Sequence, residues 1–471
     1  MNFNIDIAIV AAFLLINLIV GLYYGRDVKH IRDYAVGDKR IITTIISASI
    51  IATWISGSFF TVSISQTFKD GVWFVPAALG DVISLLVIGY ILAPRMKEFL
   101  KHISVAETMG ELYGMRIRYV TAIASIAQAV AMTALQIKVF SGIFSHFLDF
   151  SQTTATIASS FVVVFYSAWG GIRAVSFTDA LQFCTFGVFI PLFALFIWHT
   201  IGDADATRTA FQTNPLFDFS QIINYKDPRF FPNLTLMLWF LIPSLSSPTF
   251  QRALMSKDTK QIKKSFSVAA IGYTVIMVFI CIIGLLILAT NPNIDPDNIV
   301  PHIVDKYSFT GLKGIVIIGI MAMVMSTADS WINVGSVIAT HDILKPIGLK
   351  EKHELLVSRL LALMIGVVSV FLVLSSSSLF KLFSLQANFY MPIVTMPLML
   401  AILGFRTTPL SIGCGMIAGV VTVIIWKLFF TQSTGIDSVV PAMIANLFTF
   451  IIVHYLFNQP GGWIKESSII N

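Results

Sequence analysis

Long apolar runs, separated by short polar loops, repeat along the whole sequence. A run of 18 or more apolar residues is long enough to cross the hydrocarbon core of a bilayer as a helix. The pattern therefore predicts an all-α polytopic membrane protein with about thirteen transmembrane helices and one transmembrane domain over residues 1–471. The predicted helices cover residues 5–24, 41–66, 72–94, 119–147, 152–169, 175–200, 232–250, 265–290, 312–340, 355–376, 379–403, 408–430 and 437–457.

Two of these helices carry helix-breaking residues in their middles. The second contains Ser56, Gly57 and Ser58, and the seventh contains Pro243 and Pro248. Glycine lowers helix propensity, and proline removes a backbone donor. Each could be an ordinary kink of a membrane helix. Two interrupted helices in corresponding places of two halves are typical, however, of a transporter whose site lies at the breaks.

The ninth predicted helix has one charged residue near its middle, Asp329, surrounded by Ser326, Thr327 and Ser330. A charge at mid-membrane costs roughly 2.5–3.5 kcal/mol on insertion scales, so such groups persist where they face a cavity, a partner or an ion. Oxygen ligands suit hard cations. This helix is therefore predicted to supply half of a sodium site, with packing against polar neighbours as the alternative for Asp329.

Composition and charge narrow the class of protein. The chain is 56% hydrophobic and 12% charged, whereas a soluble domain carries about 25% charged residues. The three cysteines lie far apart in apolar segments and give neither a metal-binding spacing nor a disulfide framework. The net charge of +6 comes from short loops, which argues against a nucleic-acid partner.

The basic loops alternate along the chain. They follow the first, third, seventh and ninth helices, and Arg252 is counted in the third of them. By the positive-inside rule these loops are cytoplasmic, so the N-terminus is outside and the C-terminus inside. The longest loop, 201–231, then lies outside, and Glu107 belongs to a cytoplasmic amphipathic turn. We expect a multi-pass protein of a bacterial inner or plasma membrane.

Four motifs make the chain similar to the sodium/solute symporter family over nearly its whole length. The resemblance implies a LeuT-type core, in which helices two to eleven form two inverted five-helix repeats, with one additional N-terminal and two additional C-terminal helices. The implied segments are 5–24, 41–200, 232–403 and 408–457. The motifs are RDYAVGDKR (32–40), SAWGGIRAVSFTDALQ (167–182), FQRALMSKD (250–258) and VMSTADSWINVGS (324–336).

The resemblance also implies a main sodium site. Backbone carbonyls of Ala52, Ile55 and Met323 would bind the ion together with the hydroxyls of Ser326 and Thr327.

A second cation site, found in some family members, would fall on Asp179, Ser326, Asp329 and Ser330. Asp329 replaces a hydroxyl residue there, which would strengthen a cation site or make it a proton site.

The motifs ATWISGS (52–58) and MSTADS (325–330) resemble the choline-transporter branch most closely. That branch surrounds its substrate with aromatic rings, as cation–π attraction requires. Trp54 matches one wall of this cage. The positions of the other walls hold residues without aromatic rings, namely Asp81, Leu135 and Ser246.

Charged and polar residues within the spans are candidates for lining the substrate site. Lys138 would receive a substrate carboxylate while Asp81 or Trp54 meets its ammonium group, which favours a zwitterion. Alternatively, Lys138 and Asp81 neutralise each other, or Lys138 reaches the outer interface. The remaining candidates are Ser56, Ser246, Gln386 and Asn388.

These features together predict a sodium-coupled symporter that imports a small polar organic solute, a zwitterion, organic cation or carboxylate, by alternating access. Sodium is the expected coupling ion, with no other cofactor, and the solute and the bilayer are the expected partners. A proton-coupled symporter of the same fold is the alternative. A membrane-embedded sensor or intramembrane enzyme is a remote one, since the sequence contains no HExxH, GxGD or nucleophile-elbow motif.

Overall fold

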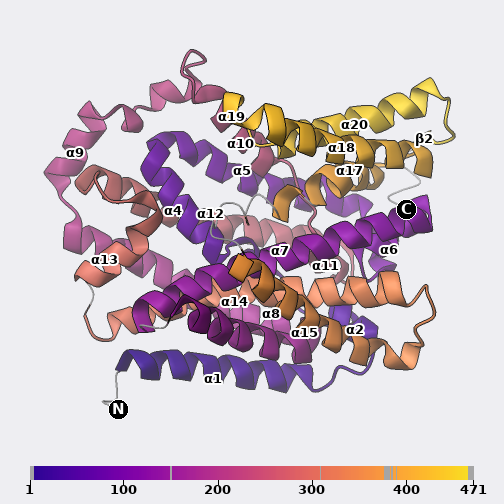
Figure 1. The fold of residues 1–471 in the computed structure, drawn as a ribbon, viewed down its shortest axis with the longest axis horizontal. Helices are drawn as coiled ribbons and strands as arrows, with labels where there is room; N and C mark the ends of the chain where they lie inside the picture. The colour runs from indigo at the N-terminus through magenta and orange to yellow at the C-terminus, as the bar shows by residue number, and fades with distance from the viewer. Residues whose placement is uncertain are drawn as a thin grey trace.

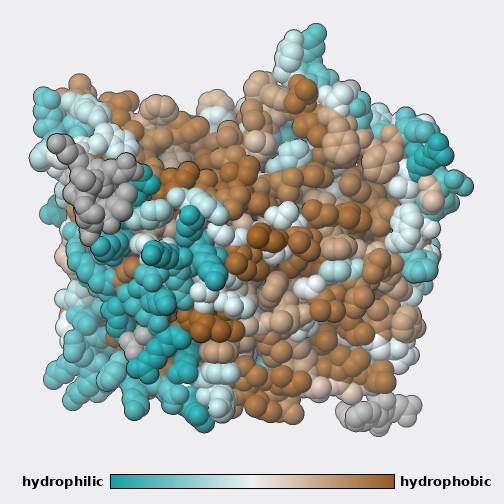
Figure 2. Space-filling model, turned by 180° about the vertical axis from the view of Figure 1, so that it is seen from behind, coloured by the Kyte–Doolittle hydropathy of each residue, from teal (hydrophilic) through white to brown (hydrophobic). Residues whose placement is uncertain are grey.

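The structure is a computed structural model that describes residues 5–148, 151–307, 309–375, 382, 386–388 and 390–464. Ten helices within these residues are long and apolar enough to cross a membrane. Many of their large hydrophobic side chains are exposed, and Figure 2 shows a broad apolar band between two polar ends of the molecule. The chain is therefore a multi-pass integral membrane protein, as its apolar runs predict.

Most predicted spans form one helix near the predicted bounds. These helices are α1 (Ile5–Gly25), α5 (Phe74–Val87), α7 (Met115–Leu148), α12 (Thr259–Thr290), α14 (Leu312–Ile338), α15 (Glu351–Ser375), α18 (Pro409–Phe429) and α20 (Val439–Leu456). π-Helical turns extend α5 through η3 (Ile88–Leu92) and α14 through η9 (Ala339–Leu344), and η10 (Met391–Thr395) leads into α17 (Met396–Leu403). Part of the predicted helix 379–403 lies outside the described residues.

The predicted helices 152–169 and 175–200 follow each other directly within α8 (Gln152–Ile201), and they are separated by a non-helical break of the backbone at Gly171. Gly171 has a φ of 62°, a left-handed conformation that glycine adopts without strain. A Cβ atom there would also lie 2.8 Å from a ring carbon of Tyr34. The break between the two predicted helices is therefore a glycine kink packed against Tyr34, with no intervening loop.

Short elements connect the spans. The segment 201–231, predicted as a loop, in fact contains α9 and two 3₁₀ turns. The short helices are α2 (Ile31–Val36), α6 (Val105–Tyr113), α9 (Ala204–Thr213), α13 (Ile299–Tyr307) and α19 (Thr431–Thr434). The 3₁₀ turns are η1 (Gly37–Lys39), η2 (Gly71–Trp73), η4 (Ala93–Arg95), η5 (Lys97–Lys101), η6 (Pro215–Phe217), η7 (Phe219–Ile223) and η8 (Pro296–Asn298). One two-residue ladder pairs β1 (Phe405–Arg406) with β2 (Gly462–Trp463).

Helix α14 lies at the centre of the molecule. Every residue from Gly319 to Ile338 is buried, and the helix packs against α1, α7, α8 and α15 (Figure 1). A helix that is buried on all sides directs its polar side chains at protein partners or at a bound ligand. The hydroxyl and carboxyl groups of α14 therefore face the neighbouring helices.

The two ends of the molecule differ. Figure 1 shows the start of α1 at the end that carries α9 and α13, and the β1–β2 ladder at the opposite end with α6. At this second end the Asp342 carboxylate binds Arg118 at 2.8 Å and accepts a 2.6 Å hydrogen bond from Ser104. These contacts join η9 to α7 and to the segment before α6, so they close this end of the bundle.

Helix α6 begins at a well-formed N-cap. The Ser104 hydroxyl accepts the Glu107 amide at 2.9 Å, and the Glu107 carboxylate accepts the Ile103 amide at 2.7 Å. The same carboxylate lies 3.4 Å from His341 at the end of α14. Burial alone would raise the pKa of Glu107, but the hydrogen bonds from His341 and Ile103 outweigh it and lower this pKa from 4.5 to about 2.

We expect Glu107→Gln to lower the melting temperature of the purified protein at neutral pH. A depressed carboxylate pKa stabilises the folded state above the unfolded pKa, and this contribution is lost as pH falls through the folded pKa. The shift bounds the contribution at about 3 kcal/mol. The difference between wild type and variant should therefore narrow as pH falls from 4.5 towards 2. A difference that stays constant over this range would show that the charge of Glu107 is unimportant.

Candidate functional site

The second predicted span is broken in the middle of the bundle. It consists of α3 (Thr43–Trp54) and α4 (Gly57–Asp70). Ile55 leaves the helical conformation with a ψ of 84°, and the Ser56 hydroxyl caps α4 by accepting the Phe59 amide at 3.0 Å. The predicted interruption at 56–58 is confirmed, and it leaves carbonyl groups at the end of α3 without helical partners.

The seventh span is broken at the same kind of position. It consists of α10 (Phe230–Leu241) and α11 (Ser247–Leu254). Leu245, in the break, has a φ of 44°, which is unusual for a residue with a side chain. The hydroxyls of Tyr390 and Thr395 each donate a 2.8 Å hydrogen bond to the break, to the carbonyls of Leu245 and Ser244 respectively. Hydrogen bonds from other segments therefore stabilise this break, which the two prolines predict.

Four of the five predicted main-site ligands meet between α3 and α14. The Ser326 hydroxyl donates to the Ala52 carbonyl at 2.8 Å and lies 3.1 Å from the Met323 carbonyl. The Thr327 hydroxyl lies 3.1 Å from the Met323 carbonyl and 3.5 Å from that of Ala52. Ile55, the fifth, follows directly at the end of α3. The result is a cluster of neutral oxygen atoms, the donor set that a hard cation prefers.

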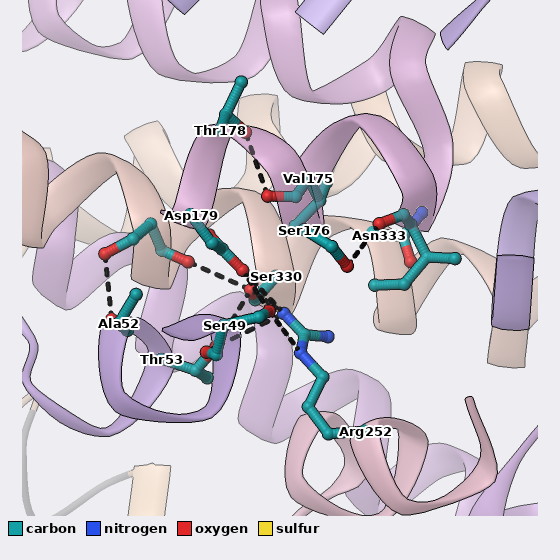
Figure 3. Close-up of polar contacts among 12 residues, drawn as sticks. Ser49, Ala52, Thr53, Val175, Ser176, Thr178, Asp179, Arg252, Ser330 and Asn333 are labelled. Atoms are coloured by element: carbon teal, nitrogen blue, oxygen red, sulfur yellow. Dashed lines mark hydrogen bonds and ion pairs between the residues drawn. The ribbon is translucent and has the colours of Figure 1, made fainter. Parts of the chain in front are cut away.

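A fixed positive charge lies beside this cluster. The Arg252 guanidinium, on α11, binds the Asp179 carboxylate at 3.1 Å and donates to the Ser330 hydroxyl at 2.5 Å (Figure 3). It also donates to Ser49 at 2.9 Å and to Thr53 at 3.2 Å. Arg252 is 1% exposed and Asp179 is 0% exposed. Hydrogen bonds to other polar groups help a fully buried ion pair to persist. The guanidinium has several, whereas one Asp179 oxygen has no hydrogen-bond partner among the described residues.

Arg252 changes the interpretation of the predicted second cation site. Of its four predicted residues, Asp179 and Ser330 bind the guanidinium, and Ser326 belongs to the main cluster. Asp329 is fully buried and contributes to the electrostatic field at Arg252. The positive charge in this region is therefore the guanidinium of Arg252, which belongs to the protein itself.

The assignment of Arg252 to a basic loop is wrong, because α11 carries it into the core. The sequence did hold one signal: Arg252 comes only four residues after Pro248, inside the second half of the broken helix.

A cavity of about 150 Å³ lies next to these clusters. Of the predicted substrate-lining residues, Trp54, Asp81, Ser246 and Gln386 line it. The sequence did not identify the other residues that matter most to its character, which are Phe59, Gln128, Trp239, Phe240 and Trp331.

Three predicted residues lie elsewhere. Ser56 is the cap of α4, and Asn388 accepts a 2.8 Å hydrogen bond from Ser438. Lys138 is not among the lining residues and makes no ion pair with Asp81. Asp81 instead accepts a 2.7 Å hydrogen bond from the Tyr273 hydroxyl. The structure therefore does not bring Lys138 and Asp81 together, either as a salt bridge or around one ligand.

A larger cavity of about 870 Å³ adjoins the smaller one, and Phe59, Trp239 and Phe240 line both. Pro228 and Arg229, from the segment between α9 and α10, line its wide part. This segment is at the end of the molecule opposite to the closing contacts of Asp342. The larger cavity therefore extends from the inner cavity towards the segment between α9 and α10.

The sodium:solute symporter family matches residues 34–419 of the chain, which is most of its length. The chain belongs to this family. It is therefore a sodium-coupled symporter of a small solute, with sodium as its coupling ion, and not an enzyme.

Related proteins transport different solutes. The high-affinity choline transporter 1 of Caenorhabditis elegans is 25% identical over 423 residues, which cover 81% of this symporter and 70% of that protein. The osmoregulated proline transporter OpuE of Bacillus subtilis (strain 168) is 23% identical over 466 residues, 94% and 93% of the two chains. The solute of this symporter therefore has to be argued from its own cavity.

A solved structure of a Na⁺-coupled sialic acid symporter, in a substrate-bound outward-open state, superposes with a TM-score of 0.84. It is 19% identical, and the match covers 98% of this symporter and 99% of that chain. This superposition confirms the predicted LeuT-type fold class.

We expect Asp179→Asn to destabilise the symporter strongly, because it leaves the Arg252 charge buried without its partner. Removing one member of a buried pair costs about 3–5 kcal/mol, whereas replacing both is often nearly neutral. Melting temperatures of purified protein should therefore fall for Asp179→Asn and recover in the double variant with Arg252→Met. Asp305→Asn is the control, since it removes the carboxylate of an exposed pair with His146. Equal melting temperatures for all three variants would contradict a tightly coupled buried pair.

Proposed function

We propose that the coupling sodium of this symporter binds between α3 and α14, at the carbonyls of Ala52, Ile55 and Met323 and the hydroxyls of Ser326 and Thr327. The observation that carries the proposal is the approach of the Ser326 hydroxyl to the Ala52 carbonyl at the end of a broken helix. In this arrangement a cation would replace a hydroxyl hydrogen bond by direct coordination. Because the ligands come from two different helices, ion binding would draw α3 and α14 together.

We further propose that the symporter couples solute movement to a single mobile sodium ion. The Arg252 guanidinium supplies a permanent positive charge beside Asp179 and Ser330, where a second sodium would otherwise bind. Like-charge repulsion over a few ångströms in a buried region disfavours a second cation. The measurement is the sodium dependence of uptake, for which this stoichiometry predicts a Hill coefficient near one. A pH dependence of transport that Asp329→Ser abolishes would instead favour the proton-coupled alternative.

Solute movement then follows from the two cavities. Solute enters through the larger cavity and binds in the smaller one, beside the sodium site. Because both lie at the breaks of α3/α4 and α10/α11, sodium and solute stabilise the same arrangement, and coupling between the two sites is reciprocal. Breaking the closure around Asp342 would open the opposite side, as alternating access requires.

The proposed orientation and repeats rest on the same geometry. The basic residues around α2 and α6 support a cytoplasmic position for the closed end, which places the larger cavity and the start of α1 outside. The segments 41–200 and 232–403 each begin with a broken helix, α3/α4 and α10/α11. This correspondence supports their assignment as the two inverted repeats.

We expect the double variant Ser326→Ala and Thr327→Ala to raise the sodium concentration for half-maximal stabilisation or uptake by about tenfold or more, since about 1.4 kcal/mol of lost ligand energy already gives tenfold. The measurement is sodium-dependent thermal stabilisation of purified protein, followed by uptake into proteoliposomes. The matched control is Ser336→Ala with Thr340→Ala, which removes two buried hydroxyls further along the same helical segment. An unchanged sodium dependence in correctly folded protein would refute the site.

A further inference from the structure

The inner cavity has one ionisable residue in its wall, and that residue is acidic. Among the described residues that line the cavity, Asp81 alone has an ionisable side chain. Lys138 lies outside the lining. Arg252 is buried behind Thr53, with its guanidinium bound to Asp179 and Ser330. A negative ligand would therefore find no positive partner in this wall, whereas a positive ligand would find Asp81.

The orientation of Asp81 is fixed from outside the cavity. One carboxylate oxygen accepts the Tyr273 hydroxyl at 2.7 Å, and the Tyr273 ring packs edge-on against Trp54 with a centroid distance of 6.2 Å. The hydrogen bond leaves most of the acceptor capacity of the carboxylate unused. A lone carboxylate at membrane depth is unfavourable unless an opposite charge compensates it. The cavity would therefore be most stable with a cation inside it.

The rest of the wall suits an organic cation better than a metal ion. Five aromatic side chains line the cavity: Trp54, Phe59, Trp239, Phe240 and Trp331. The face of an aromatic ring attracts a cationic group and also covers apolar carbon atoms. This set differs from the cage positions predicted from the sequence, of which Trp54 alone is aromatic. Phe59, Trp239, Phe240 and Trp331 come from α4, α10 and α14, so the aromatic wall is formed mainly by residues of other helices than the predicted positions.

The unsatisfied hydrogen-bonding atoms of the wall indicate what the cation must carry. The Gln128 amide nitrogen donates to the Gln386 oxygen at 3.2 Å. Its own oxygen has no hydrogen-bond partner among the described residues, although Gln128 is only 3% exposed. A buried acceptor without a donor costs about 1–3 kcal/mol, which a ligand N–H would offset. Asp81 and Gln128 thus present two acceptors to the same small space.

We propose that the solute of this symporter is a small protonated amine, held by N–H hydrogen bonds to Asp81 and by the aromatic wall. The cavity volume of about 150 Å³ corresponds to roughly five water molecules, which suits a solute of similar heavy-atom number. A quaternary ammonium ion lacks the N–H donors, and an amino acid brings a carboxylate that the wall does not pair. The inference rests on the proposed symport function, and it narrows the solute to one chemical class.

Three matched probes test the inference in the full-length, purified symporter. N,N-dimethylethanolamine is a protonated amine with one N–H, choline replaces that hydrogen by a methyl group, and N,N-dimethylglycine replaces the alcohol carbon by a carboxylate. Thermal stabilisation is titrated with each probe in sodium and in potassium buffer, and sodium-driven uptake is measured in proteoliposomes. We expect N,N-dimethylethanolamine to bind about tenfold or more tightly than either analogue, because a site that is built for a donor rejects ligands that lack it. Equal or tighter binding of choline or N,N-dimethylglycine overturns the inference.

Variants of the cavity wall then test which residues contact the amine. Asp81→Asn should weaken binding of N,N-dimethylethanolamine by about thirtyfold or more, whereas Asp305→Asn, which changes an exposed carboxylate outside the cavity, should leave it unchanged. Gln128→Leu should reduce the preference for N,N-dimethylethanolamine over choline. Wild-type binding by Asp81→Asn overturns the role of Asp81. The probe comparison in the unmodified protein decides the solute class even where a variant fails to fold.

The sodium measurements separate this inference from the symport proposal. If sodium stabilises the wild type but not the variant with Ser326→Ala and Thr327→Ala, the sodium site stands. Failure of every amine probe would then overturn the solute class alone. If sodium has no effect on stability or uptake, the proposed sodium site itself is overturned, whatever the amines do.

Discussion

Backbone polar groups inside a membrane protein must find partners, and the architecture of this symporter depends on how two interrupted helices meet that requirement. Where α3 and α10 stop in mid-bundle, the free carbonyls are taken up by hydroxyls of other helices. The Ser326 hydroxyl donates to the Ala52 carbonyl, and the Tyr390 hydroxyl donates to the Leu245 carbonyl. The Ala52 carbonyl and the Ser326 hydroxyl are also among the groups proposed to bind the sodium ion. At the proposed sodium site, a cation can therefore replace the hydroxyl that satisfies a free carbonyl.

The pair of Asp179 and Arg252 solves a second problem at the same place. It neutralises a charge in the core and ties α8 to the second half of the other broken helix, α11. Through Ser49, Thr53 and Ser330 the guanidinium also contacts α3 and α14. The buried Arg252 guanidinium therefore connects α3, α8 and α14 to α11, next to both the oxygen cluster and the inner cavity. Thr53 contacts Arg252, lines the cavity and directly follows Ala52 in the chain.

The sequence predicted those features that depend on residues close together in the chain. Gly57 and Pro243 weaken their own helices, so the two breaks could be located without a structure. Ser326 and Thr327 are adjacent polar residues in an apolar span, so the oxygen cluster could be located as well. Features that depend on tertiary position could not be predicted in this way. The charge pattern alone does not distinguish the buried Arg252 from Lys257, because the difference depends on the direction in which α11 runs.

The residues that line the inner cavity likewise could not all be predicted from the sequence. Its aromatic wall gathers Trp54, Trp239 and Trp331 from three helices, and apolar spans give no periodic signal for the face on which a tryptophan lies. The depth of Lys138 in its predicted span makes it a candidate for lining the substrate site, but the rotation of α7 keeps it out of the cavity lining. The lack of aromatic residues at the predicted cage positions therefore does not exclude an aromatic wall that is formed by other residues.

The most direct test of the central claim is amide hydrogen exchange of the full-length symporter in sodium against potassium buffer. Opening at the helix break exposes its amides, and a ligand that binds there slows their exchange. A sodium ion bound at the break should protect the segment 52–60 around the α3/α4 break and the segment 323–330 of α14, and the variant with Ser326→Ala and Thr327→Ala should lose this protection. Sodium-specific protection that leaves both segments unchanged, or that persists fully in the variant, would contradict the central claim.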